Sequence, residues 1–285
     1  MQRNPFEIVD IIDTGDTGTV CVAIDDRRRD DDQIVAVKIL TASHARDPKY
    51  VARLRREGQI LTRLHHPNIV GVHTVETVEG RPVISMEYIR GVTISELLSV
   101  TPEGMYGPIV LEVARQVAKA LDAAWNHPGD YGVPMRILHR DLKAANIMLD
   151  AEGVVKLVGF GQARAQRFAT SIQTEDHGSA NFVAPERVKG RPDSIEADVY
   201  ALGATMFQLL TGKHLDIRLT TGAHQHDKVG ALELARMSGL DPTARADALD
   251  LIDEMCAYKS DQRPTPAEVV NAISAFGIEV DLHTF

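Results

Sequence analysis

The feature that most constrains this chain is the stretch Ile-Leu-His-Arg-Asp-Leu-Lys-Ala-Ala-Asn, residues 137–146. Its last eight residues combine a carboxylate at Asp141, basic side chains at Arg140 and Lys143, and a carboxamide at Asn146. The alternative is a charged surface loop with this order by accident. Because so many set identities in so short a stretch rarely arise by chance, the order indicates a chemical site.

Composition limits the class of protein. The chain has 285 residues, of which 44% are hydrophobic and 25% charged, which suits one large domain or two close lobes. The net charge of −9 and the lack of a dense Lys/Arg run argue against a nucleic-acid surface. Cys21 and Cys256 lie far apart and lack metal-ligand spacing, which is typical of a reducing compartment. No apolar run approaches the ~20 residues that span a membrane, and we expect a cytoplasmic chain.

The N-terminal residues predict a β-hairpin. Residues 6–14 and 20–24 form its strands, with Gly15 and Gly18 in the turn and Asp13 before it. Glycines in such a turn let backbone N–H groups approach an anion, although an ordinary hairpin turn would have the same pattern.

An apolar strand with one lysine follows at residues 34–40. Burial of Lys38 is unfavourable unless the ammonium group meets an anion. Asp47 and Pro48 predict the start of an amphipathic helix over Pro48–Leu64, and Glu57 lies near its buried face. We therefore expect a Lys38–Glu57 ion pair; a surface glutamate is the alternative.

Further elements follow along the chain. Strands are expected at 69–72 and 82–86, helices at 105–125, 199–210 and 248–256, and a hairpin around residues 150–153. Capping boxes open helices at Thr93-Ile94-Ser95-Glu96 and at Thr265-Pro266-Ala267-Glu268. Gly159-Phe160-Gly161 comes after the hairpin, then a polar segment, and then Ala184-Pro185-Glu186.

In this order the motifs resemble those of a protein kinase domain of the Ser/Thr type, most similar to bacterial members, over roughly residues 6–276. The resemblance implies an α+β, bilobal fold. The N-lobe, residues 1–88, would be a small antiparallel β-sheet with one helix. The C-lobe, residues 89–285, would be larger and mainly α-helical.

The resemblance also implies roles for individual residues. Asp141 would accept the proton of the acceptor hydroxyl, Lys143 would neutralise the γ-phosphate, and Lys38 would hold the α- and β-phosphates of ATP. Asn146 would offer an oxygen to Mg²⁺. The remaining nucleotide-binding candidates are Gly15, Gly18, Val20, Ala36, the gatekeeper Met86, Glu87 and Ile89.

Other residues would support the site. Asp198 would cap the catalytic-loop backbone, and Arg263 would pair with Glu186. Arg140 would receive a phosphate from the activation segment. The candidate phosphate acceptors are Thr170, Ser171 and Thr174.

Two positions depart from the family pattern. Gly159 replaces the aspartate of D-F-G, which removes a magnesium ligand, and Asp13 replaces the first glycine of the Gly-rich loop. A bound metal contributes several kcal/mol, so its loss could slow transfer by roughly 10² to 10⁴. Asp13 could add repulsion of order 1 kcal/mol against the triphosphate.

Three functions therefore compete. The first is an impaired Ser/Thr protein kinase, a transferase with weak or dispensable Mg²⁺. The second is a nucleotide-binding pseudokinase that acts as a signalling switch or scaffold. The third is an interaction module that binds no nucleotide. The first two take ATP and a protein substrate or signalling partner, and none requires a nucleic acid or a membrane.

Overall fold

The structure is a computed structural model that describes residues 4–15, 18–29, 32–160, 164–165, 181–215, 240–278 and 280–284. The chain divides into two compact units. The N-terminal unit is Met1–Arg90 with Phe160–Gln162, and the C-terminal unit is Gly91–Gly159 with Ala163–Phe285.

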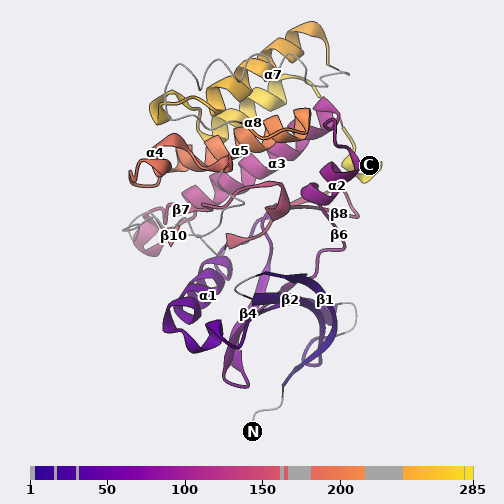
Figure 1. The fold of residues 1–285 in the computed structure, drawn as a ribbon, viewed down its shortest axis with the longest axis vertical. Coiled ribbons are helices and arrows are strands. Elements are labelled where there is room, and N and C mark those ends of the chain that lie inside the picture. The colour runs from indigo at the N-terminus through magenta and orange to yellow at the C-terminus, as the bar shows by residue number, and fades with distance from the viewer. Residues whose placement is uncertain are drawn as a thin grey trace. The chain divides into compact units, whose positions relative to one another are not determined.

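The N-terminal unit is a five-stranded antiparallel sheet with one long helix, α1 (Figure 1). The strand order is β1-β2-β3-β5-β4. The bounds are β1 Phe6–Thr14, β2 Gly18–Asp25, β3 Ile34–Leu40, α1 Pro48–Leu61, β4 Val72–Val78 and β5 Arg81–Glu87. The apolar face of α1 packs on the sheet through Leu54, which shares a buried cluster with Leu40 and Ile84. This packing holds α1 against the strand that carries Lys38.

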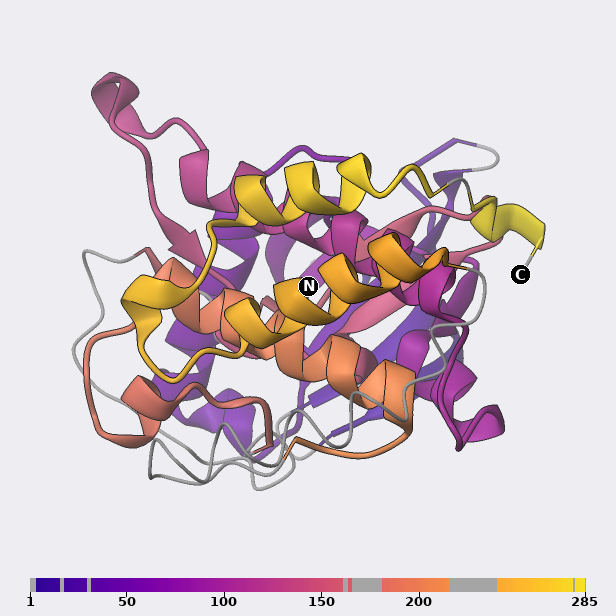
Figure 2. The ribbon, with the colours of Figure 1, turned by 90° about the horizontal axis from the view of Figure 1, so that it is seen from above.

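The C-terminal unit is mainly helical. Its helices are α2 Ile94–Val100, α3 Gly107–Asn126, α4 Pro185–Val188, α5 Ile195–Thr211, α7 Pro242–Met255 and α8 Pro266–Ala275. Figure 2 shows α7 and α8 lying over α5 and α3. Helix α5 is buried along nearly its whole length, as expected for a helix that is apolar almost all round.

Short strands of the same unit position the catalytic loop. β6 (Gly91–Thr93), β8 (Ile147–Asp150) and β9 (Val155–Leu157) form a sheet in the order β6-β8-β9. β7 (Ile137–Leu138) pairs with β10 (Arg164–Ala165). Short 3₁₀ helices cover His44–Arg46, Asp130–Gly132, Ala144–Asn146, Ser260–Gln262 and Leu282–Thr284. A β-sheet unit followed by a helical unit confirms the predicted α+β kinase-like class.

Several predicted boundaries were wrong by a few residues. The first helix ends at Leu61, not Leu64, and β4 begins at Val72 although residues 69–70 are apolar. Helices α5 and α7 begin at Ile195 and Pro242, before the apolar runs from which they were predicted. For α7 the reason is local: the Asp241 carboxylate accepts hydrogen bonds from the first-turn N–H groups, so the cap starts the helix.

Across the ranges that the structure describes, no helix is both long enough and apolar enough to cross a membrane.

Candidate active site

The N-terminal unit contains the expected lysine–glutamate pair. Lys38 Nζ lies 2.8 Å from Glu57 Oε1 and 2.9 Å from Oε2. Glu57 is only 5% exposed, so its carboxylate has little water to solvate it. The partly buried pair explains how an apolar strand can carry a lysine, and it fixes the ammonium group beside the sheet.

Strand register places four nucleotide-binding candidates on one face of this sheet. Ala36 and Lys38 are two residues apart in β3 and therefore point to the same side. Val20 in β2 lies opposite Lys38, and Met86 in β5 lies opposite Ala36. Directly paired residues share a face, so an apolar surface surrounds the ammonium group.

The glycines of the first hairpin have different roles. A Cβ on Gly18 would lie 2.6 Å from the Ile39 carbonyl oxygen, so the close approach of β3 itself requires glycine there. A Cβ on Gly15 would meet only the Gly18 oxygen, at 3.8 Å. Asp13 lies at the exposed end of β1. Packing thus accounts for Gly18 without any phosphate, whereas among the described residues no contact demands glycine at position 15.

The predicted hinge begins at the end of β5. Glu87 is tied to Gly71 twice: the Glu87 N–H donates to the Gly71 carbonyl at 2.9 Å, and the Gly71 N–H donates to Glu87 Oε1 at 2.6 Å. Ile89 is half-buried. The Glu87 N–H is therefore engaged within the protein.

The C-terminal unit brings together the three polar residues of the catalytic loop. Asn146 Nδ2 donates to the Asp141 carbonyl oxygen at 2.6 Å and to Asp141 Oδ2 at 3.1 Å. Lys143 Nζ lies 3.4 Å from the same Oδ2. A carboxylate held by an amide and an ammonium group is fixed in its orientation, as a general base requires.

Asp198, in α5, holds the backbone that precedes Asp141. The N–H groups of His139 and Arg140 each donate to the Asp198 carboxylate at 2.8 Å. Burial raises the pKa of Asp198, and these two donors and the electrostatic influence of His139 and Arg187 oppose that rise. The predicted capping role of Asp198 therefore has a direct geometric counterpart.

Gly159 follows β9 and lies against Asn146. Its φ is +82°, in the left-handed region that favours glycine. A Cβ at this position would lie 2.6 Å from both Cγ and Oδ1 of Asn146. The Asn146 carboxamide therefore occupies space that a side chain at position 159 would need.

Glu186 and Arg263 form a buried pair. Arg263 Nη1 and Nη2 donate to the two Glu186 oxygens at 2.6 and 2.8 Å. Arg263 also donates to the carbonyl oxygens of Ala257 and Glu196 and lies over the Tyr200 ring. This pair joins α4 to the start of α8, as the resemblance predicted.

Sequence reasoning missed one partner of the catalytic loop. Asp193 is buried and forms ion pairs with Arg140 and Arg187. No spacing rule links residues so far apart in the chain. The predicted phosphate acceptors Thr170, Ser171 and Thr174 lie outside the described residues.

The residues present do not fit the magnesium site that the resemblance implies. Mg²⁺ in such sites is held by carboxylates together with substrate phosphates, and Gly159 supplies no carboxylate. Asn146 contributes one amide oxygen, directed at Gly159. In the described part of the chain, no three His, Cys, Asp or Glu side chains gather into a metal-binding group.

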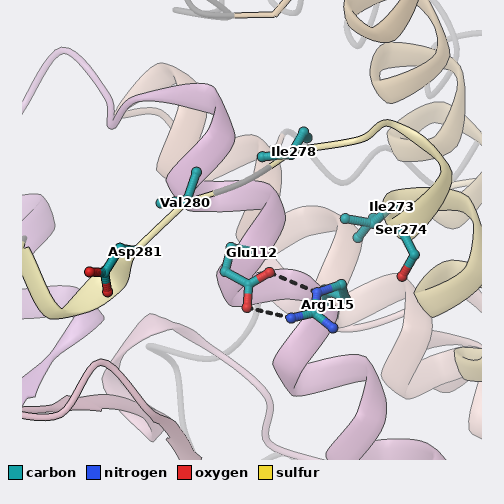
Figure 3. A pocket seen from close by; sticks show the side chains of 7 residues that line it. All are labelled: Glu112, Arg115, Ile273, Ser274, Ile278, Val280 and Asp281. Atoms are coloured by element: carbon teal, nitrogen blue, oxygen red, sulfur yellow. Dashed lines mark hydrogen bonds and ion pairs between the residues drawn. The ribbon is translucent and has the colours of Figure 1, made fainter.

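A pocket of about 670 Å³ lies elsewhere in the C-terminal unit, between α3, the end of α8 and the C-terminal segment. It is lined by Glu112, Arg115, Ile273, Ser274, Ile278, Val280 and Asp281. Figure 3 shows the Arg115 guanidinium donating to both Glu112 oxygens, at 2.6 and 2.7 Å. The lining includes none of the catalytic-loop residues.

The C-terminal unit has a capped loop with Asp141, Lys143 and Asn146, and the N-terminal unit pairs a lysine of its sheet with a glutamate of α1. This is the arrangement of a protein kinase domain. The family model described as "Protein kinase domain" matches residues 6–273, so the chain belongs to the protein kinase family.

Two kinds of relatives are similar to this chain. The serine/threonine-protein kinase PknB of Mycobacterium leprae is 37% identical over 214 residues, which cover 73% of this chain and 32% of the relative. PknB of Mycolicibacterium smegmatis is 36% identical over 215 residues, again 73% of this chain and 32% of the relative. This chain thus matches about a third of the length of these relatives. The kinase domain of Mycobacterium tuberculosis PknI has the same fold, with a TM-score of 0.66 and 23% identity over 95% of this chain and 96% of that one.

Proposed function

We propose that this chain is a Ser/Thr protein kinase domain that transfers the γ-phosphoryl group of ATP to Ser/Thr hydroxyl groups of a protein, with activity weakened by Gly159. The observation that carries the proposal is the catalytic loop: Asp141 is oriented by Asn146 and Lys143 at 3.1 and 3.4 Å. An arrangement that fixes the direction of a carboxylate suits a group that accepts a proton from a positioned substrate hydroxyl.

The proposed reaction assigns one task to each group. The Asp141 carboxylate accepts the proton of the attacking hydroxyl, the hydroxyl oxygen forms the new bond to the γ-phosphorus, and ADP leaves. Lys143 neutralises charge on the transferred group, and Lys38, held by Glu57, holds the α- and β-phosphates. No step is assigned to Mg²⁺, because Gly159 supplies no ligand for it. We therefore expect weak or dispensable magnesium dependence.

Restoring the missing carboxylate tests the proposal. Gly159→Asp should raise magnesium-dependent autophosphorylation by one or more decades, because a metal clamp is worth several kcal/mol. Aspartate tolerates positive φ better than most residues, although the Asn146 carboxamide must move aside. Transfer is measured with radiolabelled ATP, after the melting temperatures of variant and parent have been compared.

Two controls isolate the metal ligand. Gly159→Ala also places a Cβ at positive φ and in the same contact with Asn146, but it cannot bind a cation, so it should lower stability without any gain in transfer. Adding Asp141→Asn to the Gly159→Asp variant should remove the gain, because the hydroxyl then lacks its base. A gain that survives Asp141→Asn would contradict the assigned role of Asp141.

A nucleotide-binding pseudokinase that acts as a signalling switch or scaffold is the second candidate. The observation that favours it is the Asn146 carboxamide in contact with Gly159, which leaves no space for a side chain there. If Gly159→Asp folds, binds magnesium–ATP and transfers nothing, this function replaces the first. Calorimetry with ATP separates the kinase and the pseudokinase from an interaction module that binds no nucleotide. Lys38→Met should abolish ATP binding. The absence of heat when millimolar ATP is added to the parent would exclude both the kinase and the pseudokinase.

The remaining proposals concern the whole protein. A cytoplasmic location and a protein substrate or signalling partner are extensions of the family assignment.

A further inference from the structure

A buried charge cluster lies directly behind the catalytic loop. Arg140 Nη2 donates to Asp193 Oδ2, and Arg187 Nε lies 2.9 Å from Asp193 Oδ1. The exposed fractions of the three side chains are 8%, 11% and 4% for Arg140, Arg187 and Asp193. Two guanidinium groups therefore share one carboxylate where water scarcely reaches.

The cluster also fixes the backbone that precedes Asp141. Arg187 Nη1 donates to the Arg140 carbonyl oxygen at 2.8 Å, and the Arg140 N–H donates to Asp198 at 2.8 Å. Arg140 has a φ of +72°, which a non-glycine residue adopts only where its surroundings hold it. The side chain, the carbonyl and the N–H of Arg140 are thus all bound within the C-terminal unit.

Buried arginines need an anion, and its source decides how the loop is controlled. In regulated phosphoproteins a phosphate group supplies the charge and orders the segment around it. Here a carboxylate of the chain itself lies between the two arginines. It belongs to the loop before α5, not to the segment between Phe160 and Asn181 that contains the predicted acceptors.

We propose that Asp193 fills the anion site of Arg140 and Arg187, so that the catalytic loop is held in place without a phosphate. Asp193 is then a positioning residue for Asp141, and the assembled loop does not depend on modification of Thr170, Ser171 or Thr174. The effect of Asp193 on catalysis rests on the proposed kinase function, whereas the anion site formed by Arg140 and Arg187 does not depend on that function.

Anion rescue of a neutral variant tests the site. Asp193→Asn keeps the shape but leaves two buried guanidinium groups without their carboxylate, and its melting temperature should fall. Inorganic phosphate should then bind between the arginines. With a Kd near 5 mM, 50 mM phosphate should raise the Tm of this variant by about 3–5 °C, while the parent moves by less than about 1 °C.

Two further variants make this result specific. Asp25→Asn removes a buried carboxylate that is also paired with an arginine, Arg27, in the other unit, and its Tm should not respond to phosphate. Adding Arg187→Gln to Asp193→Asn removes half of the positive charge, so the double variant should melt higher than Asp193→Asn and lose its phosphate response. If Asp193→Asn folds only when phosphate is present, that result supports the site as well. A phosphate response equal to that of Asp25→Asn, or one that persists in the double variant, would overturn the proposal.

The activity measurement separates this proposal from the kinase function. Parent protein treated with phosphatase, with Thr170, Ser171 and Thr174 shown unmodified by mass spectrometry, should transfer phosphate at its untreated rate. Asp193→Asn should have a kcat at least tenfold lower with little change in the KM for ATP, and phosphate should restore part of it. A tenfold loss on dephosphorylation of the parent would refute independence from modification. If the parent transfers nothing under any condition, the kinase proposal fails, and the Tm series still decides the anion site.

Discussion

Breaking the buried Glu186–Arg263 pair should destabilise the C-terminal unit far more than breaking an exposed ion pair would. The Arg263 side chain is 0% exposed and the Glu186 side chain 9%. Glu186→Gln preserves the shape of the carboxylate but leaves a buried guanidinium without its counter-charge. Breaking a buried pair in this way typically costs about 3–5 kcal/mol.

The other contacts of Arg263 place the expected loss at the lower end of that range. Its guanidinium also donates to Ala257 O at 2.8 Å and Glu196 O at 2.9 Å, and lies 4.8 Å from the centre of the Tyr200 ring. These contacts remain in the variant and continue to solvate the charge. We therefore expect a loss of about 3 kcal/mol, which lowers the melting temperature by roughly 6–12 °C in a unit of this size.

Urea titration followed by circular dichroism measures the effect. Glu112→Gln is the matched control, because it breaks a carboxylate–arginine pair in the same unit whose Arg115 side chain is 25% exposed, and it should cost about 0.5–1 kcal/mol. Combining Glu186→Met with Arg263→Met removes both charges, so the double variant should lose less stability than the two single variants together. If Glu186→Gln costs no more than Glu112→Gln, burial does not make this pair strong and the reasoning fails.

Three further predictions concern other parts of the chain. In urea titrations, Gly153→Ala should lower the free energy of unfolding by about 1–3 kcal/mol more than Gly80→Ala does. Both glycines have φ near +77°, but only at Gly153 would a Cβ meet a neighbour, the C-terminal backbone at 2.6 Å. Equal losses would show that the backbone conformation alone matters. The Arg27 guanidinium, hydrogen-bonded to the Asp25 carboxylate, holds the pKa of Asp25 below its usual range, so the stability of the N-terminal unit should fall as the pH drops below about 4. Asp25→Asn should make this fall in stability shallower. An equally steep fall in the variant would assign the acid sensitivity to other carboxylates. Asp13→Gly should tighten ATP binding about fivefold in calorimetry, because it removes repulsion of order 1 kcal/mol, and an unchanged Kd would mean that this carboxylate does not act on the phosphates.

Local signals in the sequence were sufficient for the elements whose hydrogen bonds close within a few residues. The capping box at Thr265 forms as predicted: the Thr265 N–H donates to the Glu268 carboxylate at 2.7 Å, and the Glu268 N–H donates back to Thr265 Oγ1 at 3.3 Å. The apolar run at residues 34–40 predicted β3 with its bounds. Helix starts were less accurate because an apolar run marks where a helix is buried, whereas its cap marks where it begins.

For the candidate site, too, the sequence predicts some features and only the tertiary structure determines the others. The order of polar residues from Arg140 to Asn146, the lysine of β3 and the glycine at position 159 could all be read along the chain, since each belongs to a short motif. Only the tertiary structure decided what they contact: Asn146 lies against Gly159, and Asp193 pairs with Arg140, 53 residues earlier in the chain. The physical reason is that an ion pair between distant residues leaves no periodicity or spacing in the sequence. Which of the 40 acidic residues reaches Arg140 is determined when α5 packs behind the catalytic loop and the loop that precedes α5 comes to lie beside Arg140.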